Sequence, residues 1–85
     1  MRVLIPSALH DYTHAPWVEA QGETLGALLD DLDRQFPGLR FRMVDEQGHI
    51  RRHMRCFIGG VQIFALSHPL ATADEVLIVQ ALSGG

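Results

Sequence analysis

The two glycines that end the sequence, Gly84 and Gly85, are the residues whose type and position most directly suggest chemistry. They cap no predicted helix and lead into no later strand, so a flexible chain end is the simplest alternative. Glycine has no Cβ, and a glycine pair therefore makes a thin thread that fits a narrow active site. A terminal carboxylate reacts with nucleophiles once it is activated, for example as an acyl-adenylate. We therefore place the candidate chemistry on the Gly85 carboxylate and expect Leu82, Ser83 and Gly84 to thread into a partner's active site.

A second set of reactive side chains comprises the single cysteine, Cys56, and five histidines. His49, His53 and Cys56 are separated by three and two residues, and a zinc site needs three or four such ligands that converge. Cys56, however, lies in a strand-like stretch and on the opposite face from His53. We therefore expect no metal site and expect Cys56 to be a core or half-buried residue rather than a nucleophile.

The basic residues are all arginine, and five of the seven lie within one short stretch. These are Arg40, Arg42, Arg51, Arg52 and Arg55. One interpretation is a solvated face whose charge is balanced by Asp30, Asp31, Asp33, Asp45 and Glu46. The other is a charged rim that steers a partner protein. The formal net charge of −3 argues against a general nucleic-acid or membrane binder, because binding to phosphates needs clustered positive charge.

One helix is predicted by a stripe of apolar residues at helical spacing. The stripe consists of Leu25, Leu28, Leu29, Leu32 and Phe36. Thr24 is a suitable N-cap, because its hydroxyl accepts a hydrogen bond from a free amide of the first turn. Pro37 and Gly38 end the helix.

Stretches rich in β-branched and aromatic residues predict the strands of one sheet. They are Met1–Pro6, Trp17–Gln21, Met54–Ile58, Val61–Phe64 and Val76–Leu82. Gly59 and Gly60 predict a two-residue hairpin, because primed turns need positive φ angles. The last stretch lacks clean alternation, so we expect a central strand with both faces covered. Residues 7–16, 39–52 and 66–75 are expected to be loops or irregular.

The length of 85 residues, with 47% hydrophobic residues, indicates one globular domain. We expect an α+β domain over residues 1–82, a mixed sheet of four to five strands packed on one main helix, and a flexible tail over 83–85. No leader is recognisable, and no apolar run approaches the ~18 residues of a membrane span. A cytoplasmic location is the simplest expectation.

The sequence resembles the ubiquitin-like β-grasp sulfur carriers, which include the small subunit of molybdopterin synthase and the thiamin-pathway sulfur carrier. The resemblance covers essentially the whole chain, and the terminal glycine pair after the last strand is its most specific part. The segments that carry it are Arg2–Ile5, Thr24–Leu32, Arg55–Gly60, Asp74–Ile78 and Ala81–Gly85.

The resemblance implies a carrier rather than an enzyme. An E1-like adenylyltransferase would use ATP and Mg²⁺ to adenylate the Gly85 carboxylate. A sulfur donor of the cysteine desulfurase or rhodanese type would then convert it to a thiocarboxylate. An acceptor synthase or sulfur-transfer enzyme would receive the sulfur, with molybdopterin, thiamin thiazole, cysteine and other sulfur metabolites as possible end products. The carrier itself would bind no cofactor.

Two other functions remain open from the sequence: a small subunit that inserts its tail into a larger enzyme, and a protein modifier conjugated through Gly85. The sequence has no lysine, so it offers no side-chain amine on which chains of itself could grow. This favours sulfur carriage over chain-forming conjugation. Apolar side chains on the sheet, Phe57, Leu77 and Val79 among them, are candidates for docking these partners.

Overall fold

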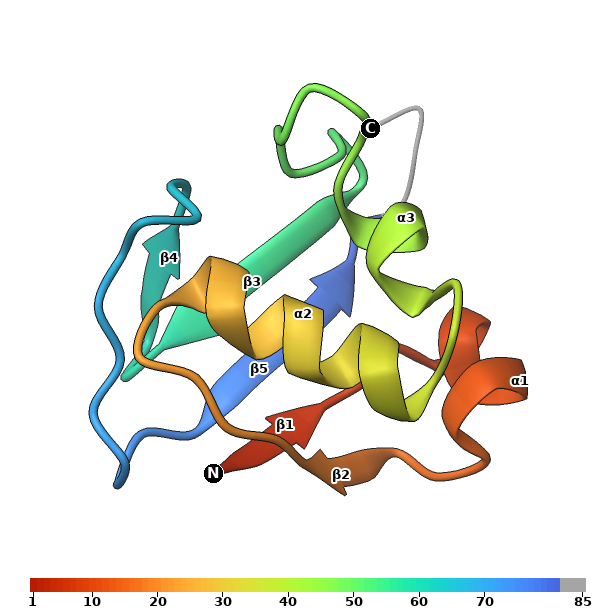
Figure 1. Ribbon diagram of the computed structural model, residues 1–85, viewed down its shortest axis with the longest axis horizontal. Coiled ribbons are helices and arrows are strands. Elements are labelled where there is room, and N and C mark those ends of the chain that lie inside the picture. The colour runs from red at the N-terminus through yellow and green to blue at the C-terminus, as the bar shows by residue number, and fades with distance from the viewer. Residues whose placement is uncertain (82–85) are drawn as a thin grey trace.

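The computed structural model describes residues 1–81 and shows a five-stranded mixed sheet that packs against helices (Figure 1). The strands are β1 (Arg2–Leu4), β2 (Trp17–Glu19), β3 (Met54–Ile58), β4 (Val61–Ile63) and β5 (Val76–Gln80). The helices are a 3₁₀ turn η1 (Ser7–Leu9), α1 (His10–Thr13), α2 (Leu25–Gln35) and α3 (Leu39–Met43). The strand order is β2-β1-β5-β3-β4; β1 and β5 are parallel, and the other neighbouring pairs are antiparallel. The expected mixed sheet on one main helix is confirmed.

Helix α2 forms where the apolar stripe predicted it, and its leucines are the centre of the core. Leu25, Leu28, Leu29 and Leu32 are all completely buried, whereas Phe36 is only partly buried. The Thr24 hydroxyl accepts a hydrogen bond from the Ala27 N–H at 3.1 Å, which confirms the N-cap.

The stretch expected to be irregular contains the short helix α3. Its start is stabilised by Asp33 of α2, whose Oδ1 accepts hydrogen bonds from the N–H groups of Gly38 and Arg40 at 3.1 Å each. Leu39 and Met43 bury its inner side. Leu39, Phe41 and Met43 alternate with two arginines, a spacing that does not predict a helix, and the contact with Asp33 is made only in the folded chain. Residues 7–16, also expected to be a loop, contain η1 and α1.

The β3–β4 hairpin turns at two glycines, as the sequence predicted. Gly59 has φ +59° and Gly60 has φ +81°, so both lie in the left-handed region that a type I′ turn requires. The turn brings Ile58 opposite Val61 and Cys56 opposite Ile63.

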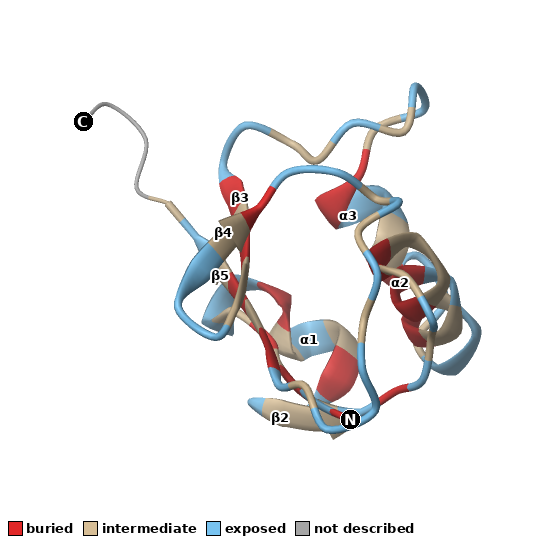
Figure 2. Cartoon of the chain, turned by 90° about the vertical axis from the view of Figure 1, so that its left-hand side faces the viewer, coloured by how far each residue is buried: buried red, intermediate tan, exposed pale blue. Residues whose placement is uncertain are grey.

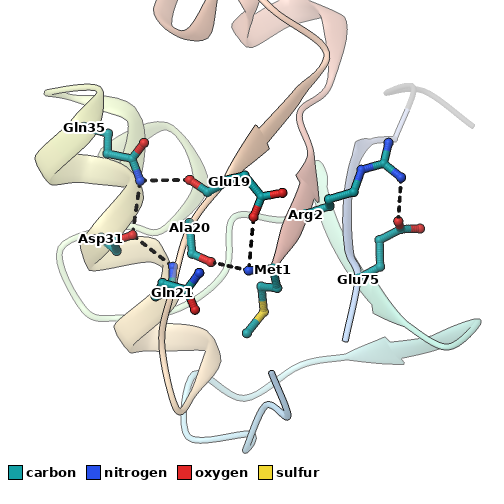
Figure 3. A network of polar contacts seen from close by, with 8 residues as sticks. All are labelled: Met1, Arg2, Glu19, Ala20, Gln21, Asp31, Gln35 and Glu75. Carbon is teal, nitrogen blue, oxygen red and sulfur yellow. Dashed lines mark hydrogen bonds and ion pairs between the residues drawn. The ribbon is translucent and has the colours of Figure 1, made fainter. Parts of the chain in front are cut away.

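Polar contacts connect the first two strands with α2 and with β5 (Figure 3). Asp31 accepts a hydrogen bond from the Gln21 N–H at 3.0 Å and another from Gln35 at 3.1 Å. The bond from Gln21, together with Arg34 and Gln35, lowers the pKa of Asp31. Arg2 forms an ion pair with Glu75 at 3.1 Å across β1 and the start of β5.

Strand β5 occupies the centre of the sheet, as predicted, but only one of its faces is covered. Val76 and Ile78 point toward α2 and are completely buried. Leu77 and Val79, on the other face, are half-buried. Figure 2 shows α2 and α3 on one side of the sheet. The expectation that both faces are covered is therefore wrong. No helix within residues 1–81 has the length and apolar character needed to cross a bilayer.

Candidate functional site

Strand β5 ends at Gln80, and the structure describes the residues that directly precede the predicted tail. After Gln80, the Ala81 N–H donates a hydrogen bond to the His53 carbonyl at 2.7 Å, which extends the pairing with β3 by one residue. The predicted roles of Leu82, Ser83, Gly84 and Gly85 fall on residues outside those that the structure describes.

On its other side, the end of β5 loses its neighbour because β1 stops pairing at Leu4. Pro6 has no N–H to donate to β5. Its carbonyl accepts instead from the Leu9 N–H at 2.9 Å, within the turn of η1. The last residues of β5 therefore pair with β3 alone, and a cavity of about 660 Å³ lies where β1 would have continued. It is lined by Ile5, Pro6, His10, Val79 and Ala81, among others.

The three predicted docking residues lie on the uncovered face of the sheet. Phe57 stands opposite Leu77, and Val79 stands opposite Arg55, in the pairing of β3 with β5. Side chains alternate between the faces of a strand, so Phe57, Leu77 and Val79 all point away from α2. The structure thus brings the three together, and their docking role stays a prediction.

The register adds two residues to this face that the sequence analysis missed. Leu4 pairs with Leu77 across β1 and β5, and Trp17 pairs with Leu4 across β2 and β1. Trp17, Leu4, Leu77 and Phe57 therefore form one row across four strands, called the outer-face row below. The guanidinium of Arg2 lies 4.0 Å from the centre of the Trp17 ring. Arg2 and Leu4 alternate with the buried Val3 and Ile5. Because this alternation puts Leu4 on the same face as the charged Arg2, it could have identified Leu4 as an outer-face residue.

The structure divides the arginine-rich stretch into paired and unpaired charges. Arg40 forms an ion pair with Asp30 at 2.9 Å. Asp31 pairs with Arg34, and Asp33 and Asp45 accept backbone hydrogen bonds. The hydrogen bonds that Asp45 accepts from the N–H groups of His49 and Gln47 lower its pKa. Within residues 1–81, Arg42, Arg51, Arg52 and Arg55 have no carboxylate at ion-pair distance. Of the five arginines in this stretch, Arg40 alone forms a direct ion pair within residues 1–81, and Arg51 interacts with Asp45 at longer range.

Cys56 is a core residue, as expected, and is poorly suited to nucleophilic chemistry. It is 1% exposed, and burial raises the pKa of its thiol to about 11. The thiol is therefore protonated at neutral pH, and the thiolate is the reactive form. His49 and His53 are exposed. No group of three metal-ligating side chains gathers within the described part of the chain.

Solved structures share this fold over 95% or more of the chain. The crystal structure of Mycobacterium tuberculosis CysO superposes with a TM-score of 0.89 and 29% identity, covering 95% of this chain and 98% of that one. The crystal structure of the Amycolatopsis orientalis BexX/CysO complex contains a chain with a TM-score of 0.89 and 26% identity, covering 99% of this chain and 98% of that one. The crystal structure of SAMP1 from Haloferax volcanii has a TM-score of 0.77 and 26% identity, covering 100% of this chain and 98% of that one.

Sequence comparison leads to the same group of proteins. The sulfur carrier protein CysO of Mycobacterium tuberculosis strain H37Rv is 30% identical over 89 aligned positions, which cover 98% of this chain and 96% of the relative. The model of the ThiS family matches residues 3–85, the last two glycines included. The chain therefore belongs to the ThiS family.

Proposed function

We propose that this protein is a sulfur carrier that bears the sulfur as a thiocarboxylate on Gly85. The match to the ThiS family over residues 3–85 is the observation that carries the proposal. The similarity over 98% of the chain to a relative named as a sulfur carrier supports it. The end of β5, paired only with β3, supports a tail that leaves the sheet and enters a partner.

The proposed chemistry takes place on the terminal carboxylate in three steps. Attack of the carboxylate oxygen on the α-phosphate of ATP releases pyrophosphate and forms an acyl-adenylate. The terminal sulfur of a donor persulfide attacks the acyl carbon, and AMP leaves. A thiol then attacks the donor sulfur of the resulting acyl disulfide, which releases the thiocarboxylate on Gly85 and a new disulfide. The thiocarboxylate delivers its sulfur to a biosynthetic acceptor without release of free sulfide.

In this scheme the protein acts as a co-substrate, and the catalytic groups belong to its partners. The adenylating enzyme supplies the ATP and Mg²⁺ site, and a cysteine desulfurase or rhodanese supplies the persulfide. Cys56 takes no part, because its thiol is buried and protonated. The outer-face row offers half-buried apolar side chains on the face opposite α2 for docking these enzymes, since apolar surface left uncovered by the fold marks interaction sites.

A second candidate is a protein modifier attached through Gly85 to lysines of other proteins. The similarity to SAMP1, a small archaeal modifier protein, favours this alternative. The two functions share the acyl-adenylate and differ in the nucleophile that attacks it, a persulfide in one case and a lysine amine in the other.

Intact-mass spectrometry tests the proposal. The full chain is incubated with an E1-like adenylating enzyme of the same organism, ATP, Mg²⁺ and a cysteine desulfurase with cysteine. We expect a mass increase equal to the difference between a sulfur and an oxygen atom, located on the C-terminal peptide. A chain that ends at Gly84 and a reaction without ATP are the controls, and neither should gain mass.

Two outcomes would contradict sulfur carriage. One is adenylation of Gly85 with no thiocarboxylate under any persulfide supply. The other is isopeptide-linked Gly85 on cellular lysines, with no thiocarboxylate on the free protein, which would establish the modifier function instead.

A further inference from the structure

Arg42 and Arg51 lie at the end of the molecule where β5 terminates. Arg42 belongs to α3 and Arg51 to the segment that follows it. Both arginines line a cavity of about 560 Å³ together with His53 and Gln80. Gln80 is the last residue of β5, so the two guanidinium groups border the base of the tail.

Each of the two guanidinium groups is held in place through its Nε atom and an aromatic residue. Arg42 Nε donates to the Tyr12 hydroxyl at 2.7 Å, and Arg51 Nε donates to the Phe41 carbonyl at 2.8 Å. The Cζ atom of Arg51 lies 4.6 Å from the centre of the Phe41 ring. An arginine fixed in this way keeps its outer N–H groups for a ligand and loses less side-chain entropy on binding.

No carboxylate of residues 1–81 lies at ion-pair distance from these two arginines, whereas Arg2, Arg34 and Arg40 each form an ion pair. Asp11 lines the same cavity but forms no ion pair with either guanidinium. Asp45 is close enough for Arg51 to contribute to the lowering of its pKa, but its Oδ1 accepts the N–H groups of Gln47 and His49. A protein of net charge −3 thus presents local positive charge beside its tail.

We propose that Arg42 and Arg51 bind carboxylates at the entrance of the active site that receives the tail. This inference rests on the proposed function, because it assigns the site to an enzyme that takes up Gly85. Phe41 is 57% exposed beside Arg51, and exposed aromatic residues with arginine are enriched in protein interfaces. The exposed Phe41 beside Arg51 favours an acidic protein surface as the ligand. The net negative charge of the chain argues against a nucleic acid.

Charge-neutralising variants test the docking site with the same E1-like enzyme. Arg42→Gln, Arg51→Gln and the double variant are compared with Arg34→Gln, whose arginine lies on α2 and pairs with Asp31. We expect KM for the carrier to rise roughly tenfold or more in the double variant at low salt, with kcat unchanged. The difference should shrink at high salt, because mobile ions screen exposed charges. Arg34→Gln should stay near wild type although it removes the same charge.

A direct titration of the full chain into the enzyme without ATP separates this site from the sulfur chemistry. If the wild-type chain gains no sulfur but binds more tightly than the double variant, the proposed function fails and the docking site stands. Equal affinities of wild type and double variant overturn the docking site, as does absence of wild-type binding. Tight, arginine-dependent binding of an RNA oligonucleotide, without an effect of the arginines on enzyme binding, overturns it in favour of a nucleic-acid ligand. Arg51→Lys, which keeps the charge but loses the planar fork, should bind with intermediate affinity.

Discussion

The single cysteine illustrates how surroundings decide the chemistry of a side chain. A sulfur carrier with one cysteine suggests at first that the thiol holds the sulfur. Cys56, however, lies on the inner face of β3, opposite Ile63 and Ile78, and is 1% exposed. Removal from water disfavours the thiolate, which raises the pKa of Cys56 to about 11. Its contribution is to packing, and the reactive group of the proposed function is a carboxylate.

The raised pKa of Cys56 predicts a loss of stability in alkaline solution. The unfolded chain releases the thiol proton near pH 9, whereas the folded protein holds it until about pH 11. Stability that is present below pH 9 should therefore fall as the pH rises toward 11, by up to roughly 3 kcal/mol. Chemical denaturation at a series of pH values measures this loss. Cys56→Ala lacks the titrating group, so its stability should approach that of wild type as the pH rises. Parallel curves for the two proteins would show that the thiol does not titrate differently on folding.

Gly22, which precedes α2, is required by the close approach of its backbone to the helix. A Cβ at this position would lie 2.4 Å from the Leu28 nitrogen and 2.8 Å from the Leu28 Cα. Both are backbone atoms of α2 at the buried residue Leu28, so the clash cannot be relieved by a side-chain movement. We expect Gly22→Ala to lower the free energy of unfolding by about 3 kcal/mol, at the upper end of the range for overpacking.

The control for this prediction is Gly48→Ala. Gly48 has φ +82°, but a Cβ at this position would have no atom within 4 Å, so only backbone strain opposes the substitution. That strain costs about 1–2 kcal/mol. Urea denaturation of both variants measures the two losses. A Gly22→Ala protein no less stable than Gly48→Ala would mean that the loop before α2 moves away from the helix at little cost.

Local sequence signals predicted some segments and could not predict others. Helix α2 has a complete apolar stripe and an N-cap, and the β3–β4 hairpin has its glycine pair, so both were correctly predicted. Helix α3 depends on Asp33, which precedes it by several residues and bonds to its first amides only in the folded chain. The close contact of Gly22 with α2 is likewise tertiary and leaves no local pattern.

The two faces of the sheet differ in how they are covered, and the proposed function assigns partner binding to the uncovered face. The inner face buries Val3, Val76 and Ile78 against α2, and the outer-face row lies on the opposite side. The sequence predicted the central place of β5 but assigned cover to both of its faces. The sequence shows only that a residue is apolar, not whether its side chain packs in the core or lies on an uncovered face. For that reason the unbroken apolar run of β5 could not distinguish a face covered by helices from an uncovered one.

Substitutions at adjacent residues of β5 should separate the two roles. Leu77→Thr keeps a strand-forming residue on the outer face and removes apolar surface, so we expect a small change in Tm and weaker binding to the adenylating enzyme. Ile78→Ala leaves a cavity under α2 and should lower the free energy of unfolding by about 2–5 kcal/mol. Because Ile78 is completely buried, the folded fraction of that variant should bind like wild type. Thermal unfolding and calorimetric titration measure both effects. If Leu77→Thr bound the enzyme as tightly as wild type, the outer-face row would not be the docking surface, and the arginines at the tail base would have to provide most of the recognition.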